Sequence, residues 1–492
     1  MICMIQIIRN ERAVLWQPLI WGAILALTSV ASLAAPAQSP KPGEVLKALH
    51  NAQVPREAMS WVVQEVGKPT ATSRWQAELA VNQASLFKLV TTYAALDTLG
   101  PAWSWSTPVW LQGRLTGPDV FEGDLIIKGS GDPKLVQERL WLLLRRVQQM
   151  GVREIRGDIV LDNSAFVIEP RSPADFDGEP TRPGNALPDA LMLNQKSLLL
   201  SFTPDIAHGL ARVSSDTHLA GVTISASVPL LTGPCTDWRS ALKATLNDAT
   251  RIHFSGGYIA SCGEQRWPLA YVDPTSFNAR LIESQWRELG GRLSGTVRAG
   301  LAPIDIKPTL EFSSPALADV VRDINKYSNN VMAQQLFLTL ALQSSAGAPA
   351  SEPDARAVLR DWLGKKLSGV DLQSIVIDNG SGLSRQTRIS ASVLAQLLLT
   401  AWGSPVMPEL IASLPLAGLD GTTTRDSARF GKALAKAHLK TGSLRDVVAV
   451  AGYVLAESGR RYVVVGIINH ANAGNARGAL DALVRWTALD AP

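Results

Sequence analysis

A serine and a lysine three positions apart, Ser85 and Lys88, are the pair in this sequence best suited to nucleophilic chemistry. The apolar spacing over 85–99 predicts a helix, and residues i and i+3 of a helix share one face. A neutral lysine amine can then take the hydroxyl proton, provided that burial and nearby positive charge lower its affinity for protons. The helix start also brings a backbone N–H beside Ser85, as half of an oxyanion hole. The pattern indicates acyl transfer through a serine.

A second polar motif stands where two predicted helices, 316–327 and 331–342, are joined. A hydroxyl and an amide at such a junction can both project into a cleft. Ser328 is a candidate to relay a proton to a leaving amine. Asn330 is a candidate to hold Lys88 or a substrate amide.

The third motif lies on the edge of a predicted strand, 437–444. The hydroxyls of Thr441 and Ser443, with the charge of Lys440, form a binding place for a terminal carboxylate. Gly442 lets a substrate backbone approach closely. The Ser443 N–H can complete the oxyanion hole, and the Lys440 charge can lower the proton affinity of the lysine in the first motif.

Each motif has an ordinary structural explanation when it is taken alone. Ser85 can be a helix N-cap, and the other two motifs can be a capped helix junction and an exposed strand edge. Ser240 and Lys243 repeat the spacing of the first motif. We set them aside because they lie in a β-rich segment near Cys235, away from the other motifs. The order of the three motifs, together with the local structure predicted around each, carries the assignment.

The elements that must position these motifs come from both ends of the chain. Alternating apolar residues predict strands at 59–66 and 75–81, and three more strands with a terminal helix near the C-terminus. Helices on an antiparallel sheet make one α+β domain, split by a large β-rich insertion in two parts. We expect a catalytic domain, a first inserted domain and a second, β-rich inserted domain, which span 45–106 with 305–492, 107–163 with 264–304, and 164–263 respectively.

Composition excludes several classes of function. The 492 residues are 46% hydrophobic and 18% charged, which is a globular balance and not a disordered one. The net charge of +4 is small and is not gathered into basic blocks, so nucleic acid is not an expected partner. The six histidines show no metal-ligand spacing, and we expect neither a metal nor another cofactor.

The first 35 residues resemble a secretory signal, with a basic start, a short apolar run and small residues before the expected cleavage site. The alternative is an uncleaved membrane anchor. We expect a periplasmic or otherwise extracytoplasmic protein with at most peripheral membrane contact. Cys3 leaves with the signal, and Cys235 and Cys262 are predicted to form one disulfide in an oxidising compartment, the alternative being two buried thiols.

The chain as a whole resembles the class C low-molecular-mass penicillin-binding proteins, the D-alanyl-D-alanine carboxypeptidase/endopeptidases of the penicillin-binding protein 4 type. The resemblance covers nearly all of the mature chain. The segments that carry it are 84–88 with 94–100, 123–125 with 131–133, 185–188, 378–385, 414–418 with 420–422, and 440–444.

This resemblance implies a penicilloyl-serine transferase fold with extra domains between the first two motifs, where Ser328 follows Ser85 by 243 positions (328 − 85). It implies cleavage of D-Ala-D-Ala stem peptides and peptidoglycan cross-links through an acyl-enzyme, with β-lactams as covalent inhibitors. Arg385 and Asp162 are candidates for binding the diaminopimelate part of the stem. Asn329 departs from the family's usual Asp, at a position to which no catalytic role is given.

Two other functions remain open from the sequence. A β-lactamase would need a second base to hydrolyse the acyl-enzyme quickly, and no carboxylate can be placed there from the sequence. A cell-wall-binding scaffold could keep the fold without catalysis, although all three motifs retain reactive side chains. The oligomeric state and the balance between carboxypeptidase and endopeptidase activity are not encoded in any pattern that we recognise.

Overall fold

The structure is a computed structural model that describes residues 42–491. The expected signal sequence and Cys3 lie outside the described residues. The described residues form one compact unit, so the three-domain division stays a prediction. No helix within residues 42–491 is long and apolar enough to cross a membrane.

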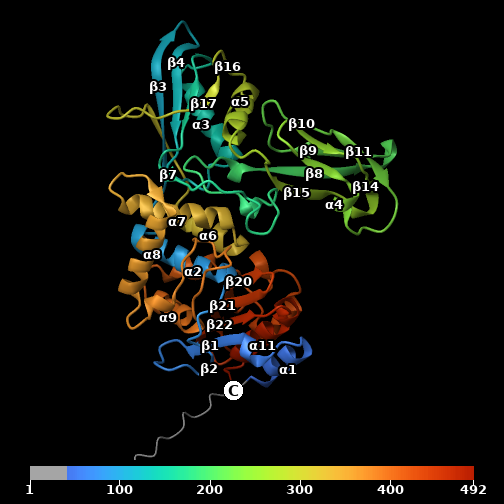
Figure 1. Cartoon of the computed structure of the whole chain (residues 1–492), viewed down its shortest axis with the longest axis vertical. Coiled ribbons are helices and arrows are strands. Elements are labelled where there is room, and N and C mark those ends of the chain that lie inside the picture. The colour runs from blue at the N-terminus through green and yellow to red at the C-terminus, as the bar shows by residue number, and fades with distance from the viewer. Residues whose placement is uncertain (1–41, 492) are drawn as a thin grey trace, which may run out of the picture. The chain divides into compact units, whose positions relative to one another are not determined.

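A five-stranded antiparallel sheet joins the two ends of the chain (Figure 1). β1 lies between β2 and β22, with Trp61 opposite both Trp75 and Gly466. β20 is the edge strand and pairs with β21, Lys440 opposite Ala451. The mixed α and β fold with a split sheet is therefore confirmed. In sheet order the strands are β2 (Ser73–Trp75), β1 (Met59–Glu65), β22 (Arg461–Asn469), β21 (Val447–Leu455) and β20 (Ala437–Leu444).

Alternation along the strands gives this sheet two apolar faces, each with its own core. On β21, Val448 and Val450 pack on one side, while Ala449 and Ala451 pack on the other. The first side is covered by α11 (Arg477–Ala488), on which α1 (Gly43–Asn51) packs. The other side is covered by a larger helical layer. Its helices are α2 (Phe87–Leu99), α6 (Leu317–Tyr327), α7 (Asn330–Ser344), α8 (Glu352–Lys366), α9 (Ala391–Trp402) and α10 (Met407–Ser413).

The residues between the first two motifs form further sheets with a shared apolar core. One sheet holds β16 (Arg292–Leu293), β5 (Glu154–Arg156), β4 (Val120–Lys128), β3 (Ser106–Thr116), β18 (Leu310–Ser313), β6 (Ile159–Asp162) and β17 (Val297–Ala299), with α3 (Gln137–Gln149) and α5 (Phe277–Glu288) nearby. A second holds β14 (Tyr258–Ile259), β11 (Ser227–Leu231), β9 (Leu210–Ser215), β8 (Ser197–Asp205) and β15 (Gln265–Ala270). A smaller sheet holds β10 (Thr223–Ile224), β13 (Arg251–Phe254) and β12 (Ala244–Asp248). The strand β7 (Phe166–Val167) pairs outside this region with β19 (Ala350–Ser351), which follows the second motif.

The predicted disulfide is present in this inserted part. Cys235 and Cys262 are bonded and lie 27 positions apart in the sequence. Cys262 is 8% exposed and belongs to the core of the insertion. The alternative of two free thiols is therefore wrong.

Some predicted elements differ in extent. The strand expected at 75–81 is only β2 with an isolated bridge at Val81. The segment 292–298 holds two short strands, β16 and β17, on either side of Gly295, where a Cβ would lie 2.2 Å from the Gly157 carbonyl oxygen. Such close backbone approach disrupts regular pairing. The helix α8 was not predicted, although Ser351 and the N3 residue Asp354 form a capping box that marks its start.

Candidate active site

Ser85 stands in a short 3-10 turn, η2 (Ala84–Leu86), directly before α2. The sequence predicted an α-helix from Ser85, whereas the α-helix begins at Phe87. Ala84 has a φ of 50°, a value that L residues seldom adopt. The Ala84 N–H donates to Asn82 Oδ1 at 2.9 Å, which fixes this turn. The turn keeps the serine half-exposed at the helix start, as the first motif required.

Lys88 lies one turn further on and is completely buried. Its Nζ donates to Ser85 Oγ at 3.0 Å and to Asn330 Oδ1 at 2.7 Å. A third bond runs to the Ser381 carbonyl oxygen at 2.6 Å. An ammonium has three N–H donors, and three acceptors therefore satisfy it in full. The structure therefore brings Ser85 and Lys88 of the first motif together with Asn330 of the second.

The segment behind Lys88 supplies contacts that its own sequence pattern did not indicate. Thr91 Oγ1 donates to the Gly380 carbonyl oxygen at 2.7 Å, beside the Ser381 carbonyl that accepts from Lys88. A Cβ at Gly382, whose φ is +74°, would lie 2.1 Å from the Ala84 carbonyl oxygen. Glycine is required here because the two backbones touch. The signal for this segment was its place among the family motifs and nothing more local.

Ser328 ends α6 in the left-handed conformation, with φ 57° and ψ 37°. Strain of this kind in a non-glycine residue gathers at functional sites. Its Oγ accepts a hydrogen bond from Lys440 Nζ at 2.9 Å. Asn329 caps α7 through the Met332 N–H at 3.0 Å and donates to Gln195 Oε1 at 2.9 Å. Asn329, the residue that departs from the family pattern, therefore caps a helix and contacts none of the candidate catalytic groups by these bonds.

The edge strand β20 lies directly against the Ser85 turn. A Cβ at Gly442 would lie 2.8 Å from the Gln83 carbonyl oxygen and 3.2 Å from the Ser85 nitrogen. Glycine is needed at 442 because the backbone of the Ser85 turn comes so close. The sequence suggested a different reason, the approach of a substrate backbone. Lys440 donates to its neighbour's carbonyl, at Thr441, at 2.7 Å.

The two lysines form the electrostatic centre of the site. Burial lowers the pKa of the Lys88 ammonium well below its usual range, and the positive charge of Lys440 lowers it further. Burial lowers the pKa of Lys440 from 10.5 to about 7. Water-excluded amines near a hydroxyl can lose a proton near neutral pH, which is what a general base must do. A neutral Lys88 keeps two N–H donors for the Asn330 and Ser381 oxygens, and its lone pair can then accept the proton of the Ser85 hydroxyl.

We expect a Lys440→Met variant to be more stable than the parent below pH 7, by on the order of 1–3 kcal/mol. The unfolded chain keeps the Lys440 pKa near 10.5, so between pH 7 and 10.5 it binds more protons than the folded chain. The parent's stability therefore rises with pH over that window, and the variant's advantage shrinks. Urea unfolding from pH 5 to 10 measures both curves. A variant less stable than the parent at pH 6 contradicts this reading of the buried charge.

The carboxylate-binding candidates have neighbours of their own. The hydroxyls of Thr441 and Thr422 lie 2.7 Å apart. Arg477 Nη2 donates to Ser443 Oγ at 2.7 Å. Neither Thr422 nor Arg477 was singled out from the sequence for this role, although Thr422 belongs to the family segment 420–422. Arg477 follows Ser443 by 34 positions and belongs to no motif.

The two candidates for binding the diaminopimelate part, Arg385 and Asp162, differ in exposure. Arg385 is exposed and its guanidinium lies 4.9 Å from the Phe176 ring centroid. Asp162 is 1% exposed, accepts from the Ser164 and Ala302 N–H groups, each at 2.8 Å, and lies 3.8 Å from Lys128 Nζ. These contacts hold the end of β6 in place. The role of Asp162 in binding diaminopimelate stays a prediction.

The second serine–lysine string has no such surroundings. Ser240 Oγ donates to Asp237 Oδ2 at 2.5 Å, at the exposed start of the short helix α4 (Trp238–Ala241). Asp237 is the N-cap of this helix and also accepts from the Ser240 N–H, so the Ser240 hydroxyl takes part in a local cap. Among residues 42–491 no group of three or more histidine, cysteine, aspartate or glutamate side chains could hold a metal ion.

Comparison with known proteins places this geometry in a family. The model of the D-Ala-D-Ala carboxypeptidase 3 (S13) family matches residues 43–489. A D-alanyl-D-alanine carboxypeptidase DacB of Haemophilus influenzae is 24% identical over 400 residues, which cover 80% of this chain and 81% of the relative. A D-alanyl-D-alanine carboxypeptidase of an Actinomadura species is 27% identical over 411 residues, which cover 80% of this chain and 74% of the relative.

Solved structures agree at the level of the fold. The crystal structure of penicillin-binding protein 4 from Haemophilus influenzae matches with a TM-score of 0.73 and 21% identity, covering 91% of this chain and 99% of that one. The same protein complexed with a β-lactam matches with a TM-score of 0.67 and 20% identity, covering 88% and 96%. At this identity the likeness establishes a shared architecture.

Proposed function

This chain belongs to the D-Ala-D-Ala carboxypeptidase 3 (S13) family, and we propose that it is a serine D,D-peptidase acting on peptidoglycan stem peptides. The observation that carries the proposal is the position of the buried Lys88 amine, 3.0 Å from Ser85 Oγ and 2.7 Å from Asn330 Oδ1. A nucleophile, a base and a group that orients the base are thereby within hydrogen-bonding reach of each other. Relatives named as D-alanyl-D-alanine carboxypeptidases support the substrate class.

In the proposed reaction, Ser85 Oγ attacks the carbonyl carbon of the D-Ala-D-Ala peptide bond while Lys88 takes its proton. Backbone N–H groups of Ser85 and Ser443 stabilise the oxyanion. The C–N bond then breaks, and Ser328, which Lys440 contacts, relays the proton taken by Lys88 to the departing amine. Water then attacks the ester carbonyl carbon while Lys88 takes one of its protons. The bond to Ser85 Oγ breaks, Lys88 returns that proton to the serine oxygen, and the shortened peptide leaves with a free carboxylate.

The proposed substrate orientation follows from the strand β20. The terminal carboxylate lies at the Thr441 and Ser443 hydroxyls, near the charge of Lys440. The exposed Arg385 is a candidate for the diaminopimelate carboxylate. The same serine would be acylated by β-lactams, as the complexed structure of the Haemophilus protein suggests by analogy of fold.

Two alternatives receive less support. Among the described residues no carboxylate contacts Ser85, Lys88, Ser328, Asn330 or Lys440, so a base for rapid acyl-enzyme hydrolysis has no candidate in contact with the site. The intact hydrogen-bonded cluster argues against a scaffold without catalysis. The disulfide supports an oxidising, extracytoplasmic location, which we propose with export by residues 1–35.

Digestion of purified peptidoglycan sacculi tests the proposal. We expect free D-alanine, and monomeric muropeptides released from cross-linked dimers, to accumulate and to be resolved by chromatography. Prior treatment with penicillin is expected to block both, because the acyl-enzyme occupies Ser85. If untreated protein releases neither product, the peptidase assignment fails; if penicillin is consumed with rapid turnover, the β-lactamase alternative replaces it.

A further inference from the structure

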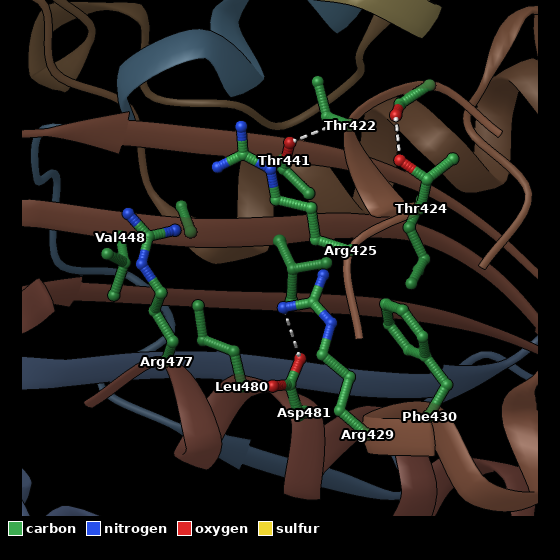
Figure 2. Close-up of a pocket in the computed structure, with 14 residues that line it drawn as sticks. Thr422, Thr424, Arg425, Arg429, Phe430, Thr441, Val448, Arg477, Leu480 and Asp481 are labelled. Carbon is green, nitrogen blue, oxygen red and sulfur yellow. Dashed lines mark hydrogen bonds and ion pairs between the residues drawn. The ribbon is translucent and has the colours of Figure 1, made fainter. Parts of the chain in front are cut away.

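A cationic pocket lies next to the proposed site and contains none of its reacting groups. It measures about 690 Å³ and is lined by Thr441 of β20 together with three arginines, Arg425, Arg429 and Arg477. Figure 2 shows these three side chains reaching into the pocket from the loop after Thr422 and from the start of α11. The pocket therefore begins at the strand on which we place the terminal carboxylate of the substrate.

The charge of the pocket favours an anionic ligand. Its one carboxylate, Asp481, lies 3.5 Å from Arg429, so that two guanidiniums remain without a carboxylate partner among the pocket's lining residues. Burial raises the pKa of Asp481, which disfavours the charged form of this carboxyl. Arg425 is exposed, and Arg477 is bonded only to a neutral hydroxyl. Guanidinium groups bind carboxylates through paired, charge-assisted hydrogen bonds.

The floor of the pocket is apolar. Val448 and Val450 of β21 lie beside Leu480 of α11 and Phe430. A ligand with an aliphatic chain between charged groups fits such a combination of floor and rim better than a free inorganic anion does.

Two hydrogen bonds link the pocket to the carboxylate-binding candidates of β20. Thr441 shares a hydrogen bond with Thr422 at 2.7 Å, and Ser443 accepts one from Arg477 at 2.7 Å. Both partners line the pocket. A leaving group whose first carboxylate lies at Thr441 and Ser443 would therefore extend into the arginine pocket if it were longer than one alanine.

We infer that this pocket is a subsite for the leaving-group side of a cross-linked substrate, where Arg425 and Arg477, the two guanidiniums without a carboxylate partner in the lining, bind further carboxylates of the second stem peptide. The inference rests on the proposed peptidase function and adds to it the place where the leaving-group side of a cross-linked substrate binds. A D-alanine leaving group is too short to need the pocket. The amino acid that leaves when a cross-link is cut carries an aliphatic side chain and the remainder of an anionic peptide.

The test compares two substrates in one enzyme. For Arg425→Gln we expect kcat/KM to fall about tenfold for release of monomers from a purified cross-linked muropeptide dimer, because one charge-assisted contact is lost. Release of D-alanine from a monomeric pentapeptide should stay within about twofold. Arg425→Glu should lower cross-link cleavage further, and Arg425→Lys should restore part of it.

The matched control is Arg266→Gln, which removes the same charge from exposed strand β15, away from the pocket lining. It should leave both activities unchanged. Equal loss of both activities in Arg425→Gln, loss of neither, or a parent that releases D-alanine without cutting the dimer would overturn the subsite. A parent inactive on both substrates would instead overturn the peptidase function on which the subsite depends. The rate of acylation by labelled penicillin, unchanged in Arg425→Gln, reports that the variant is folded.

Discussion

A Ser85→Ala variant is expected to form no covalent adduct with a labelled penicillin, and to lose peptide hydrolysis by on the order of 10⁴-fold or more. The loss is large because Ser85 Oγ is the hydroxyl within 3.0 Å of the buried Lys88 amine. Removing it leaves the base without a nucleophile to deprotonate. Adduct formation is measured by gel fluorescence and intact mass, and hydrolysis by D-alanine release.

Ser240→Ala is the matched control, because it makes the same substitution in the other serine–lysine string of the chain. The Ser240 hydroxyl bonds to Asp237 at an exposed helix start, so this variant should acylate and hydrolyse at the parent rate. A penicillin adduct that persists in Ser85→Ala and disappears in Ser240→Ala would mean that the nucleophile has been misidentified.

Much of the catalytic sheet could be predicted from the sequence because its signals are local. The strand predicted at 437–444 has the bounds of β20 in the structure, because side chains along a strand alternate between its two faces. The pairing of β1 with β22 joins distant segments. The sequence predicted only that strands from both ends of the chain share one domain, since helices and strands must form a common core.

The contacts that surround the catalytic groups could not be predicted from local sequence patterns. The Ser381 carbonyl that accepts from Lys88 is 293 positions away in the sequence, and a backbone oxygen leaves no mark on residue type. The surroundings of Asp162 could not be predicted for a related reason, because the sequence gives the type of a side chain but not its burial. The arginine pocket exists only where α11 and the loop after Thr422 meet β20.

The second large effect is expected at Lys88. We expect Lys88→Met to lower the rate of penicillin acylation and of peptide hydrolysis by about 10³-fold, because general-base catalysis is removed while Ser85 remains. Lys88→Arg should be equally impaired, since a guanidinium keeps its proton and cannot accept another. The rising limb of the parent's pH profile reflects loss of the Lys88 proton at its lowered pKa, and it should be absent from the residual activity of Lys88→Met. Stopped-flow acylation from pH 5 to 9 measures both effects.

Lys243→Met tests whether these losses are specific to the buried amine. Lys243 follows Ser240 with the same spacing, but the Ser240 hydroxyl is already bonded to Asp237, so this lysine has no proton to accept. Its replacement should leave the acylation rate and the pH profile unchanged. Lys88→Met has a structural cost of its own, because the Asn330 and Ser381 oxygens lose a donor, and its unfolding must be measured beside its activity. If Lys88→Arg acylates at the parent rate in a folded protein, positive charge and not proton transfer is what Lys88 supplies, and the base must be sought elsewhere.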